Sequence, residues 1–335
     1  MTWLDQFYRS AKPLIFRLDA EAAHGMAFRG LKTLHTLGML PHRLVEKPKT
    51  VFGMSFLNDV GLAAGFDKNA EWLPLLPSLG FGFAEIGTVT PRPQAGNPKP
   101  RLFRFQDTQS LFNRMGFNNE GGEVISKRLR EAKKILPEWF RVGVNIGKNK
   151  DTPNERAYQD YETLVAQFHD SADFFVINVS SPNTPGLRSL QTSAALERIV
   201  CAVQEINSRQ SSAPKPILVK LAPELQEDLP TLQGLAEKEI QWKLSGWVLT
   251  NTLSGDYASS SLSLKGGWSG ACLKTDARSM LKAFKKVSKL PLISVGGIDS
   301  SAEMEYRRSL GADLIEVYSG WIYQYPYWVS DALKS

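Results

Sequence analysis

The chain has 335 residues, of which 42% are hydrophobic and 22% charged, and its formal net charge at pH 7 is +6. Because an α/β barrel of this size forms one domain around one large core, the length does not require two domains. The two cysteines, Cys201 and Cys272, have no Cys-x-x-Cys spacing, and the four histidines show no ligand spacing. The sequence therefore argues against a metal site or a disulfide framework and predicts a reduced, intracellular protein.

The positive net charge raises the question of a polyanionic partner, but the lysines and arginines are scattered along the chain. The densest run lies at residues 127–134 and reads KRLREAKK. Such a run is typical either of the solvated face of a helix or of a nucleic-acid patch. Because it stands alone, the helix face is favoured, and we expect no nucleic-acid partner.

Residues 1–45 differ from the rest because their hydrophobic residues recur at helical spacing in two segments, 4–18 and 23–37. No apolar run in the chain reaches the roughly 18 residues that span a bilayer, and no signal peptide is recognised. Two interpretations of this amphipathic helix pair stay open. It is either a cap packed on the main domain or a surface that lies in a membrane interface, with its basic groups toward anionic lipid.

From residue 59 onward the chain repeats one unit: a short apolar run, a polar or glycine-rich end, and a helical pattern. Eight such runs occur, at residues 60–64, 83–88, 141–146, 174–179, 216–221, 246–250, 292–295 and 314–318. Helical patterns lie between them, for example at residues 153–168, 192–208, 224–243, 275–287 and 302–310. This alternation predicts an α/β fold, a parallel (β/α)8 TIM barrel over residues 46–335. A doubly wound sheet is the alternative, but no G-x-G-x-x-G follows the first strand.

Polar residues follow nearly every predicted strand, most densely in the stretch from residue 173 to residue 191. There an apolar run ends in Asn178, Ser180, Ser181, Asn183 and Thr184. Carboxamides and hydroxyls at the end of a buried strand are either turn residues or groups that a ligand pairs with. Since barrel active sites form where the strands end, we interpret them as part of a ligand site.

Two glycine-containing turns follow the last two predicted strands. Gly296 and Gly297 precede one helical pattern, and Ser319 and Gly320 precede another. Free backbone N–H groups at such turns bind anions, and barrels often hold a phosphate between the loops after strands seven and eight. The two turns together predict a phosphate-bearing ligand.

Ten motifs together resemble one family. They read AAGFDKN (63–69), EIGTVTPRPQAGNPKPRLFR (85–104), NRMGFNN (113–119), VNIGKNK (144–150), INVSSPNTPGLR (177–188), VKLAP (219–223), GWVLTNT (246–252), GGWSG (266–270), SVGGIDS (294–300) and GADLIEVYSG (311–320). They resemble the dihydroorotate dehydrogenases. The N-terminal helix pair and Ser181 resemble the class 2, quinone-dependent members, because class 1 enzymes lack that extension and use a cysteine as base.

The resemblance implies oxidation of (S)-dihydroorotate to orotate in pyrimidine biosynthesis, with FMN as the hydride acceptor and a membrane quinone, ubiquinone or menaquinone, as the final oxidant. It further implies a monomer attached peripherally to the cytoplasmic side of a bacterial inner membrane. The N-terminal segment 1–45 would then form a quinone tunnel, with His24 and Arg104 at its inner end. Two alternatives remain: an FMN-dependent enzyme for another dihydropyrimidine, such as a dihydrouridine synthase acting on tRNA, and a non-catalytic flavin-binding paralogue.

The resemblance also assigns roles to single residues, and no metal ligand is among them. Ser181 is the implied base, with Thr184 as its relay and Lys68 as the cation beside the substrate carboxylate. The implied substrate-binding residues are Lys68, Asn113, Arg114, Met115, Gly116, Phe117, Asn178, Asn183, Asn251 and Thr252. Those implied for FMN are Ala64, Gly65, Phe66, Asp67, Lys68, Thr88, Asn145, Asn178, Lys220, Thr250, Gly270, Gly297, Tyr318 and Ser319. Lys220 is expected against the flavin, and an internal salt bridge is the alternative.

The sequence departs from the family pattern mainly in one region. Residues 253–256 and 271–273 replace residues that are common in the family, and Tyr325 stands where a glycine is common. These residues lie beside the substrate and phosphate loops, so we expect the departures to affect substrate affinity and the shape of the phosphate cradle.

Overall fold

The computed structural model describes residues 2–210, 213–259 and 262–334. Its centre is a closed barrel with the strand order β10-β13-β14-β3-β4-β7-β8-β9. Its strands are β3 (Val60–Leu62), β4 (Phe83–Val89), β7 (Arg141–Ile146), β8 (Phe174–Asn178), β9 (Ile217–Leu221), β10 (Gly246–Leu249), β13 (Leu292–Val295) and β14 (Leu314–Val317). Neighbouring strands pair in parallel. The predicted TIM barrel is confirmed, and its strands are mostly apolar because parallel strands are buried on both faces.

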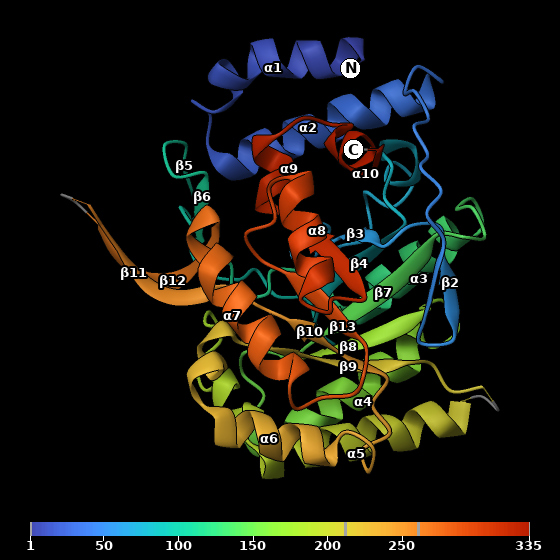
Figure 1. Ribbon diagram of the computed structural model, residues 1–335, viewed down its shortest axis with the longest axis vertical. Helices are drawn as coiled ribbons and strands as arrows, with labels where there is room; N and C mark the ends of the chain where they lie inside the picture. The colour runs from blue at the N-terminus through green and yellow to red at the C-terminus, as the bar shows by residue number, and fades with distance from the viewer. Residues whose placement is uncertain (1, 211–212, 260–261, 335) are drawn as a thin grey trace.

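Helices surround this barrel (Figure 1). They are α3 (Gly122–Lys133), α4 (Ala157–Phe168), α5 (Ser193–Gln210), α6 (Leu229–Lys238), α7 (Lys274–Lys285), α8 (Ser301–Ser309), α9 (Ser319–Tyr323) and α10 (Trp328–Lys334). The helix expected at 224–243 is shorter than predicted. A 3-10 turn, η4 (Pro223–Glu227), comes first, and the Asp228 side chain then caps α6 by accepting from Thr231 N.

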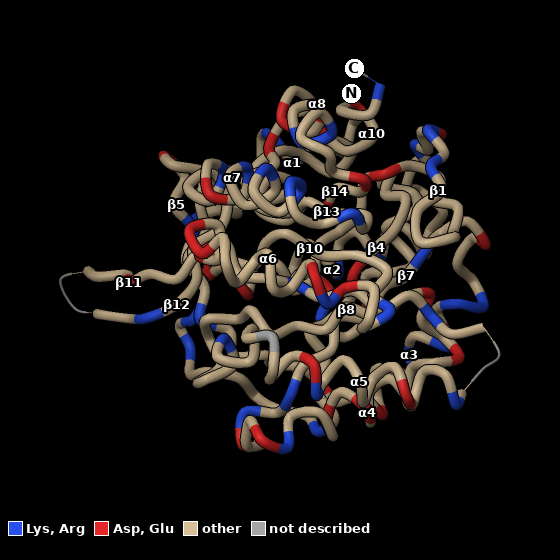
Figure 2. The backbone as a smooth tube through the Cα atoms, turned by 60° about the horizontal axis from the view of Figure 1, so that its bottom comes forward, with Lys and Arg blue, Asp and Glu red and all other residues tan. Residues whose placement is uncertain are grey.

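The basic run at residues 127–134 lies on α3, as the helix-face interpretation predicted. Leu129 and Ala132 of this run are buried, whereas Lys127 pairs with Glu123 one turn away at 2.8 Å. Acidic and basic residues also occur together along α5, whereas the charged residues of α4 are acidic (Figure 2).

The N-terminal helix pair consists of α1 (Trp3–Ile15) and α2 (Ala20–Thr36), and it lies beside α9 and α10 (Figure 1). Three hydrogen bonds join α1 to the C-terminal region among the described residues. Tyr8 Oη donates to Ile322 O at 2.6 Å, Lys12 Nζ donates to Tyr323 O, and Tyr327 N donates to Asp5 Oδ1 at 3.2 Å. Large hydrophobic side chains stay exposed near this end, namely those of Trp3, Phe7, Leu14, Leu18, Met26, Leu37 and Met39. Among the helices described, none combines the length and the apolar character needed to cross a bilayer.

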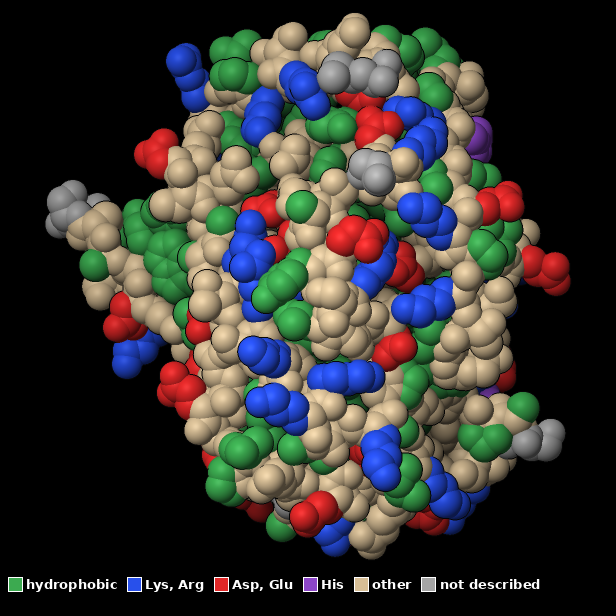
Figure 3. Space-filling model, viewed as in Figure 1, with side chains coloured by type: hydrophobic (Ala, Val, Ile, Leu, Met, Phe, Trp, Pro, Cys, Tyr) green, Lys and Arg blue, Asp and Glu red, His purple; other side chains and the backbone are tan. Residues whose placement is uncertain are grey.

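A second sheet of four antiparallel strands, in the order β11-β12-β6-β5, was not predicted. Its strands are β5 (Leu102–Phe105), β6 (Ser110–Asn113), β11 (Leu253–Ser259) and β12 (Leu262–Gly270). The β11–β12 hairpin projects from the body of the protein (Figures 1 and 2), and hydrophobic side chains gather at its root (Figure 3). Residues 253–256, which were expected to be loop, are thus strand, and residues 271–273 form the 3-10 turn η5 (Ala271–Leu273). The effect of these departures on substrate affinity and on the phosphate site stays a prediction.

The reason lies in tertiary packing. Every second residue of β11 faces an aromatic cluster made of Phe103, Phe105, Phe112, Tyr257 and Trp268, in which the Phe103 and Tyr257 rings are 4.9 Å apart. This cluster joins segments about 150 residues apart in the chain, so a local pattern rich in serine and glycine gives little indication of it. A smaller hairpin of β1 (Lys49–Val51) and β2 (Met54–Phe56) packs Phe56 on Phe83 of β4, with ring centroids 5.4 Å apart.

Candidate active site

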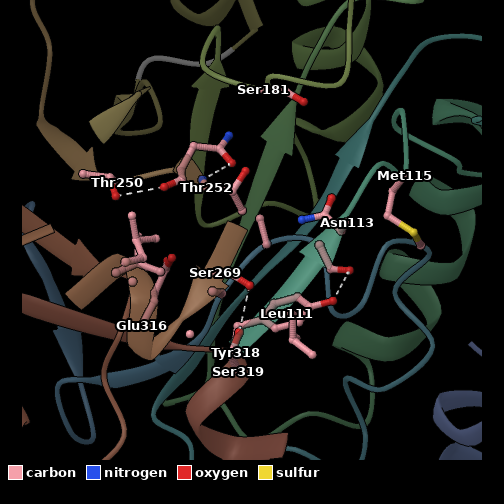
Figure 4. Close-up of a pocket in the computed structure, with 18 of the residues that line it drawn as sticks. Leu111, Asn113, Met115, Ser181, Thr250, Thr252, Ser269, Glu316, Tyr318 and Ser319 are labelled. Carbon is pink, nitrogen blue, oxygen red and sulfur yellow. Dashed lines mark hydrogen bonds between the residues drawn. The ribbon is translucent and has the colours of Figure 1, made fainter. Parts of the chain in front are cut away.

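A cavity lies at the carboxyl ends of the barrel strands, where the sequence placed the ligand site (Figure 4). Most of the predicted site residues line it: Ala64, Gly65, Lys68, Thr88, Asn113, Met115, Gly116, Phe117, Asn178, Ser181, Asn183, Lys220, Thr250, Asn251, Thr252, Gly270, Gly297, Tyr318 and Ser319. Asn178, Ser181 and Asn183 from the stretch 173–191 are thus brought together with the ends of β3, β4, β9, β10, β13 and β14.

Five of the residues predicted for catalysis, substrate or FMN do not line this cavity: Phe66, Asp67, Arg114, Asn145 and Thr184. The Asp67 carboxylate accepts hydrogen bonds from Glu71 N (2.8 Å) and Trp72 N (2.9 Å), so it shapes the loop after β3. Burial raises the pKa of Asp67 to about 6. Thr184 is buried, and no hydrogen bond between its side chain and Ser181 exists in the described part of the chain.

A network of buried amides and hydroxyls forms one wall of the site. Asn178 Nδ2 donates to Thr88 Oγ1 (2.9 Å) and to Asn145 Oδ1 (3.0 Å), and Thr88 Oγ1 donates to Asn145 Oδ1 (2.5 Å). Ser180 Oγ donates to Asn178 Oδ1 (3.0 Å) and accepts from Asn251 Nδ2 (2.9 Å). Because these groups hold one another in place, the hydrogen-bonding groups that remain free are fixed for a ligand. Asn145 therefore belongs to the support of the site rather than to its surface.

Ser181 and Lys68 face the same cavity with few partners of their own. Ser181 is buried, and its Oγ accepts a hydrogen bond from Asn183 N at 3.2 Å. Burial lowers the pKa of Lys68 to about 8, and the nearby charge of Glu21 opposes this shift. A cation at low dielectric attracts a carboxylate strongly, so Lys68 can hold an acidic ligand within reach of Ser181.

Lys220 forms an internal ion pair as well as lining the cavity. Its Nζ lies 3.4 Å from Glu85 Oε1 and 3.8 Å from Glu316 Oε2. The salt bridge, which was the less favoured alternative, is thus present, and it does not exclude contact with a ligand. Neither glutamate was predicted to belong to the site. A charged residue inside a run that predicts a buried strand must have a partner. This rule would have indicated that Glu85 and Glu316, which lie in two such runs, belong with Lys220.

The turns after β13 and β14 form a small cradle. Gly297 has φ +72°, and a Cβ there would lie 2.5 Å from Lys274 Cα; a Cβ on Gly320 would lie 2.0 Å from Ile298 O. In the described backbone, the amides of Gly297, Ser319 and Gly320 donate no hydrogen bond to another residue. Ser269, which was not predicted, lies beside them with its Oγ 2.9 Å from Ser319 Oγ. Unpaired amides and a hydroxyl group at close quarters fit a phosphate.

A second, mostly apolar cavity of about 710 Å³ lies between the helix pair and the barrel. His24 and Arg104 both line it, and Phe66 does so too. Leu102, Leu111 and Tyr318 line both cavities, so these side chains lie between the two spaces. Burial lowers the pKa of His24 to about 4, with help from the charge of Lys68, which keeps its ring neutral at physiological pH.

This TIM barrel has an anion cradle after its last two strands, a fixed array of amides and a buried lysine. Together these features define a class of enzymes that bind a phosphorylated ring system at the strand ends. The family model described as "Dihydroorotate dehydrogenase" matches residues 48–335. The chain belongs to the dihydroorotate dehydrogenase family.

Individual relatives agree over nearly the whole chain. Proteins named dihydroorotate dehydrogenase (quinone) from Alkalilimnicola ehrlichii and Nitratiruptor sp. are 41% and 42% identical, covering 98% and 95% of this chain and 98% and 91% of their own. The crystal structure of the Eimeria tenella enzyme in complex with ferulenol has a TM-score of 0.82 at 35% identity, covering 94% of this chain and 90% of its own.

Proposed function

We propose that this protein oxidises (S)-dihydroorotate to orotate in pyrimidine biosynthesis and passes the electrons to a quinone. The family and the names of its relatives support the reaction and the class of oxidant. The observation that carries the proposal is the shared wall of the two cavities. An acidic, ring-shaped substrate fits the cavity that carries Lys68 and the amide side chains, and a lipid-soluble oxidant fits the mostly apolar one.

On the substrate side, we assign the base to Ser181, which removes the proton from C5 of the ring. Lys68 would hold the substrate carboxylate, and the amides of Asn113, Asn183 and Asn251 would pair with the alternating donors and acceptors of the ring. Asn183 Nδ2 donates to Asn113 Oδ1 at 3.0 Å, and this contact fixes both amides relative to each other. We keep Thr184 as the proposed relay, acting through a water molecule, because the two side chains are not directly bonded.

The family is flavin-dependent, and we propose FMN in particular. The residues fit this cofactor because the cradle of Gly297, Ser319 and Gly320 has unpaired amides and no room for side chains. Thr88, Asn178 and Lys220 would hold the ring system. FMN, when bound, supplies the acceptor for the hydride that leaves C6 of the substrate.

We further propose that residues 1–45 form a membrane-associating segment on a barrel domain of residues 46–335. The exposed hydrophobic side chains of α1 and α2 would lie in the lipid interface at the cytoplasmic face of an inner membrane. Ubiquinone or menaquinone would then enter the apolar cavity beside His24 and Arg104. The protein would work as a monomer, because the cavities are complete within one chain.

An anaerobic absorption spectrum tests this proposal. We expect the purified protein to show a bound-flavin band that bleaches with (S)-dihydroorotate and returns with a short-chain ubiquinone. A band that does not bleach would indicate a different dihydropyrimidine substrate. Protein without flavin would contradict the assignment of the cradle and of the function.

A further inference from the structure

Three ionisable side chains from different strands meet inside the barrel, below the cavity. They are Glu85 of β4, Lys220 of β9 and Glu316 of β14, and their side chains are at most 5% exposed. Two carboxylates and one ammonium group would leave a net negative charge in a region without solvent. Such a charge is costly, and a buried acid is neutralised by binding a proton instead. One proton should therefore be shared by the two glutamates.

The hydrogen bonds show which glutamate holds the negative charge. Glu85 Oε1 accepts from Asn145 Nδ2 and from Lys220 Nζ, the latter at 3.4 Å. Glu316 Oε2 lies 3.8 Å from Lys220 Nζ, and neither oxygen of Glu316 has a hydrogen-bond partner among the described residues. Donors stabilise an ionised carboxylate, so Glu85 is the better site for the charge and Glu316 for the proton.

Glu316 also borders the cavity, on the same side as Thr250 (Figure 4), although its oxygens are shielded from solvent. We propose that Glu316 is held as a neutral carboxylic acid, so that Glu85 alone carries the negative charge that balances Lys220. The effect of this arrangement on the flavin rests on the proposed function, since it needs a flavin in the cavity.

The electrostatics of the site agree with this protonation state. The charged groups that face Glu316 in the described structure are Glu85 and Lys220. Burial raises the pKa of Glu316 well above its ordinary value, the charge of Glu85 raises it further, and Lys220 opposes both effects. With Glu316 neutral, the three groups carry no net charge, and the barrel interior does not repel a flavin that gains negative charge on reduction.

The test compares Glu316→Gln with the matched variant Glu85→Gln in the FMN-loaded protein. Glutamine resembles a neutral glutamic acid in size and keeps a hydrogen-bond donor. We expect Glu316→Gln to leave the midpoint potential of FMN nearly unchanged. Glu85→Gln removes an ionised carboxylate, and it should shift the potential upward, favouring the reduced flavin by about tenfold or more.

Infrared spectroscopy supplies a readout that does not depend on turnover. The wild-type protein should show a protonated-carboxyl C=O band that shifts in deuterium oxide, and this band should be lost in Glu316→Gln. The spectra are recorded well above pH 6, because burial raises the pKa of Asp67 to about 6 and a protonated Asp67 would otherwise contribute. The wild-type spectrum keeps the test decisive even if a variant does not fold.

The outcomes distinguish a failure of the proposed function from a failure of the protonation state inferred for Glu316. Wild-type protein that binds no FMN would contradict the proposed function, whereas the infrared band tests the protonation of Glu316 by itself. Protein that binds FMN and is bleached by (S)-dihydroorotate, but lacks the infrared band, would overturn the assignment of Glu316 alone. So would an upward shift of the potential in Glu316→Gln as large as that in Glu85→Gln, because it would mean that Glu316 is ionised.

Discussion

Glu21 of α2 and Arg101 form a two-point ion pair that fastens the N-terminal helix pair to the barrel. Arg101 Nε lies 3.0 Å from Glu21 Oε2, and Arg101 Nη2 lies 2.9 Å from Glu21 Oε1. Arg101 Nη1 also donates to Asn97 O at 3.0 Å, and Asn97 Nδ2 donates to Arg114 O at 2.8 Å. The helix pair is thereby linked to the loop that carries Met115, Gly116 and Phe117 into the site.

Replacing Glu21 by glutamine should lower the free energy of unfolding by about 1 to 3 kcal/mol, because the largely buried Arg101 guanidinium loses its carboxylate. Urea denaturation measures this loss. Lys99→Gln is the control: its ammonium is exposed and 3.8 Å from Glu21, so its effect should stay within about 0.5 kcal/mol. Equal losses for both variants would show that the ion pair does not fasten the helices.

Arg188 holds the loop that carries Ser181. Its Nε donates to Ser180 O (2.8 Å) and its Nη2 to Thr252 O (2.9 Å), while Nη1 reaches Glu224 Oε1 and Ser254 Oγ, both at 2.6 Å. The guanidinium therefore ties the loop after β8 to the chain after β10, on either side of the proposed substrate.

Arg188→Ala should lower kcat/KM for dihydroorotate by roughly 10- to 100-fold, since it removes several charged hydrogen bonds and frees the loop. Steady-state kinetics at saturating quinone gives kcat/KM, and Arg188→Lys should recover only part of the kcat/KM that Arg188→Ala loses. Arg209→Ala, which breaks an exposed ion pair with Glu205, is the control and should leave kcat/KM unchanged. Unaltered kinetics in Arg188→Ala would rule out this role for the loop contact.

Ser181→Ala should slow flavin reduction by dihydroorotate by about 10²- to 10⁴-fold, because it removes the proposed base. The wild-type rate should rise toward alkaline pH, since the base must lose its proton. Stopped-flow absorbance measures both effects, and reoxidation of chemically reduced enzyme by quinone serves as the internal control that the variant leaves intact. A flat profile from about pH 6 to about pH 9 would count against Ser181.

His24 should make the protein less stable in mild acid. Its pKa is lowered from 6.5 to about 4 in the folded state, so the unfolded chain binds a proton first as the pH falls. The stability that neutral His24 contributes is fully present above about pH 6.5. It is lost between about pH 6.5 and 4, which lowers the free energy of unfolding by about 1 to 3 kcal/mol. His24→Gln should remove this part of the slope when unfolding is measured across that range. If the free energy of unfolding depends on pH with the same slope in wild type and variant, the lowered pKa of His24 is contradicted.

Gly320→Ala should weaken FMN binding and destabilise the protein by about 1 to 3 kcal/mol, because the new Cβ would lie 2.0 Å from Ile298 O in the cradle. Gly234→Ala in α6 is the matched control, since a Cβ there meets nothing within 4 Å. It should stabilise the helix by about 0.5 to 1 kcal/mol. Thermal unfolding with and without FMN distinguishes weaker FMN binding in Gly320→Ala from a lower stability of the protein itself.

The sequence by itself determined the barrel and the position of its active site. Each barrel strand is a short apolar run whose hydrophobicity is visible within five or six residues, and polar groups after such a run must lie at the strand ends. For the same reason, Ser181, Lys68 and the glycine turns could be assigned to one cavity before the strands were placed in space.

Only the tertiary structure decided the relationships between distant segments. The pairing of β12 with β6, the ion pair between Glu21 and Arg101 and the meeting of Glu85, Lys220 and Glu316 each join residues far apart in the chain. Local periodicity carries no information about such partners, because they depend on how the barrel closes and on which side chains then share a buried space. The protonation state inferred for Glu316 follows from that closure.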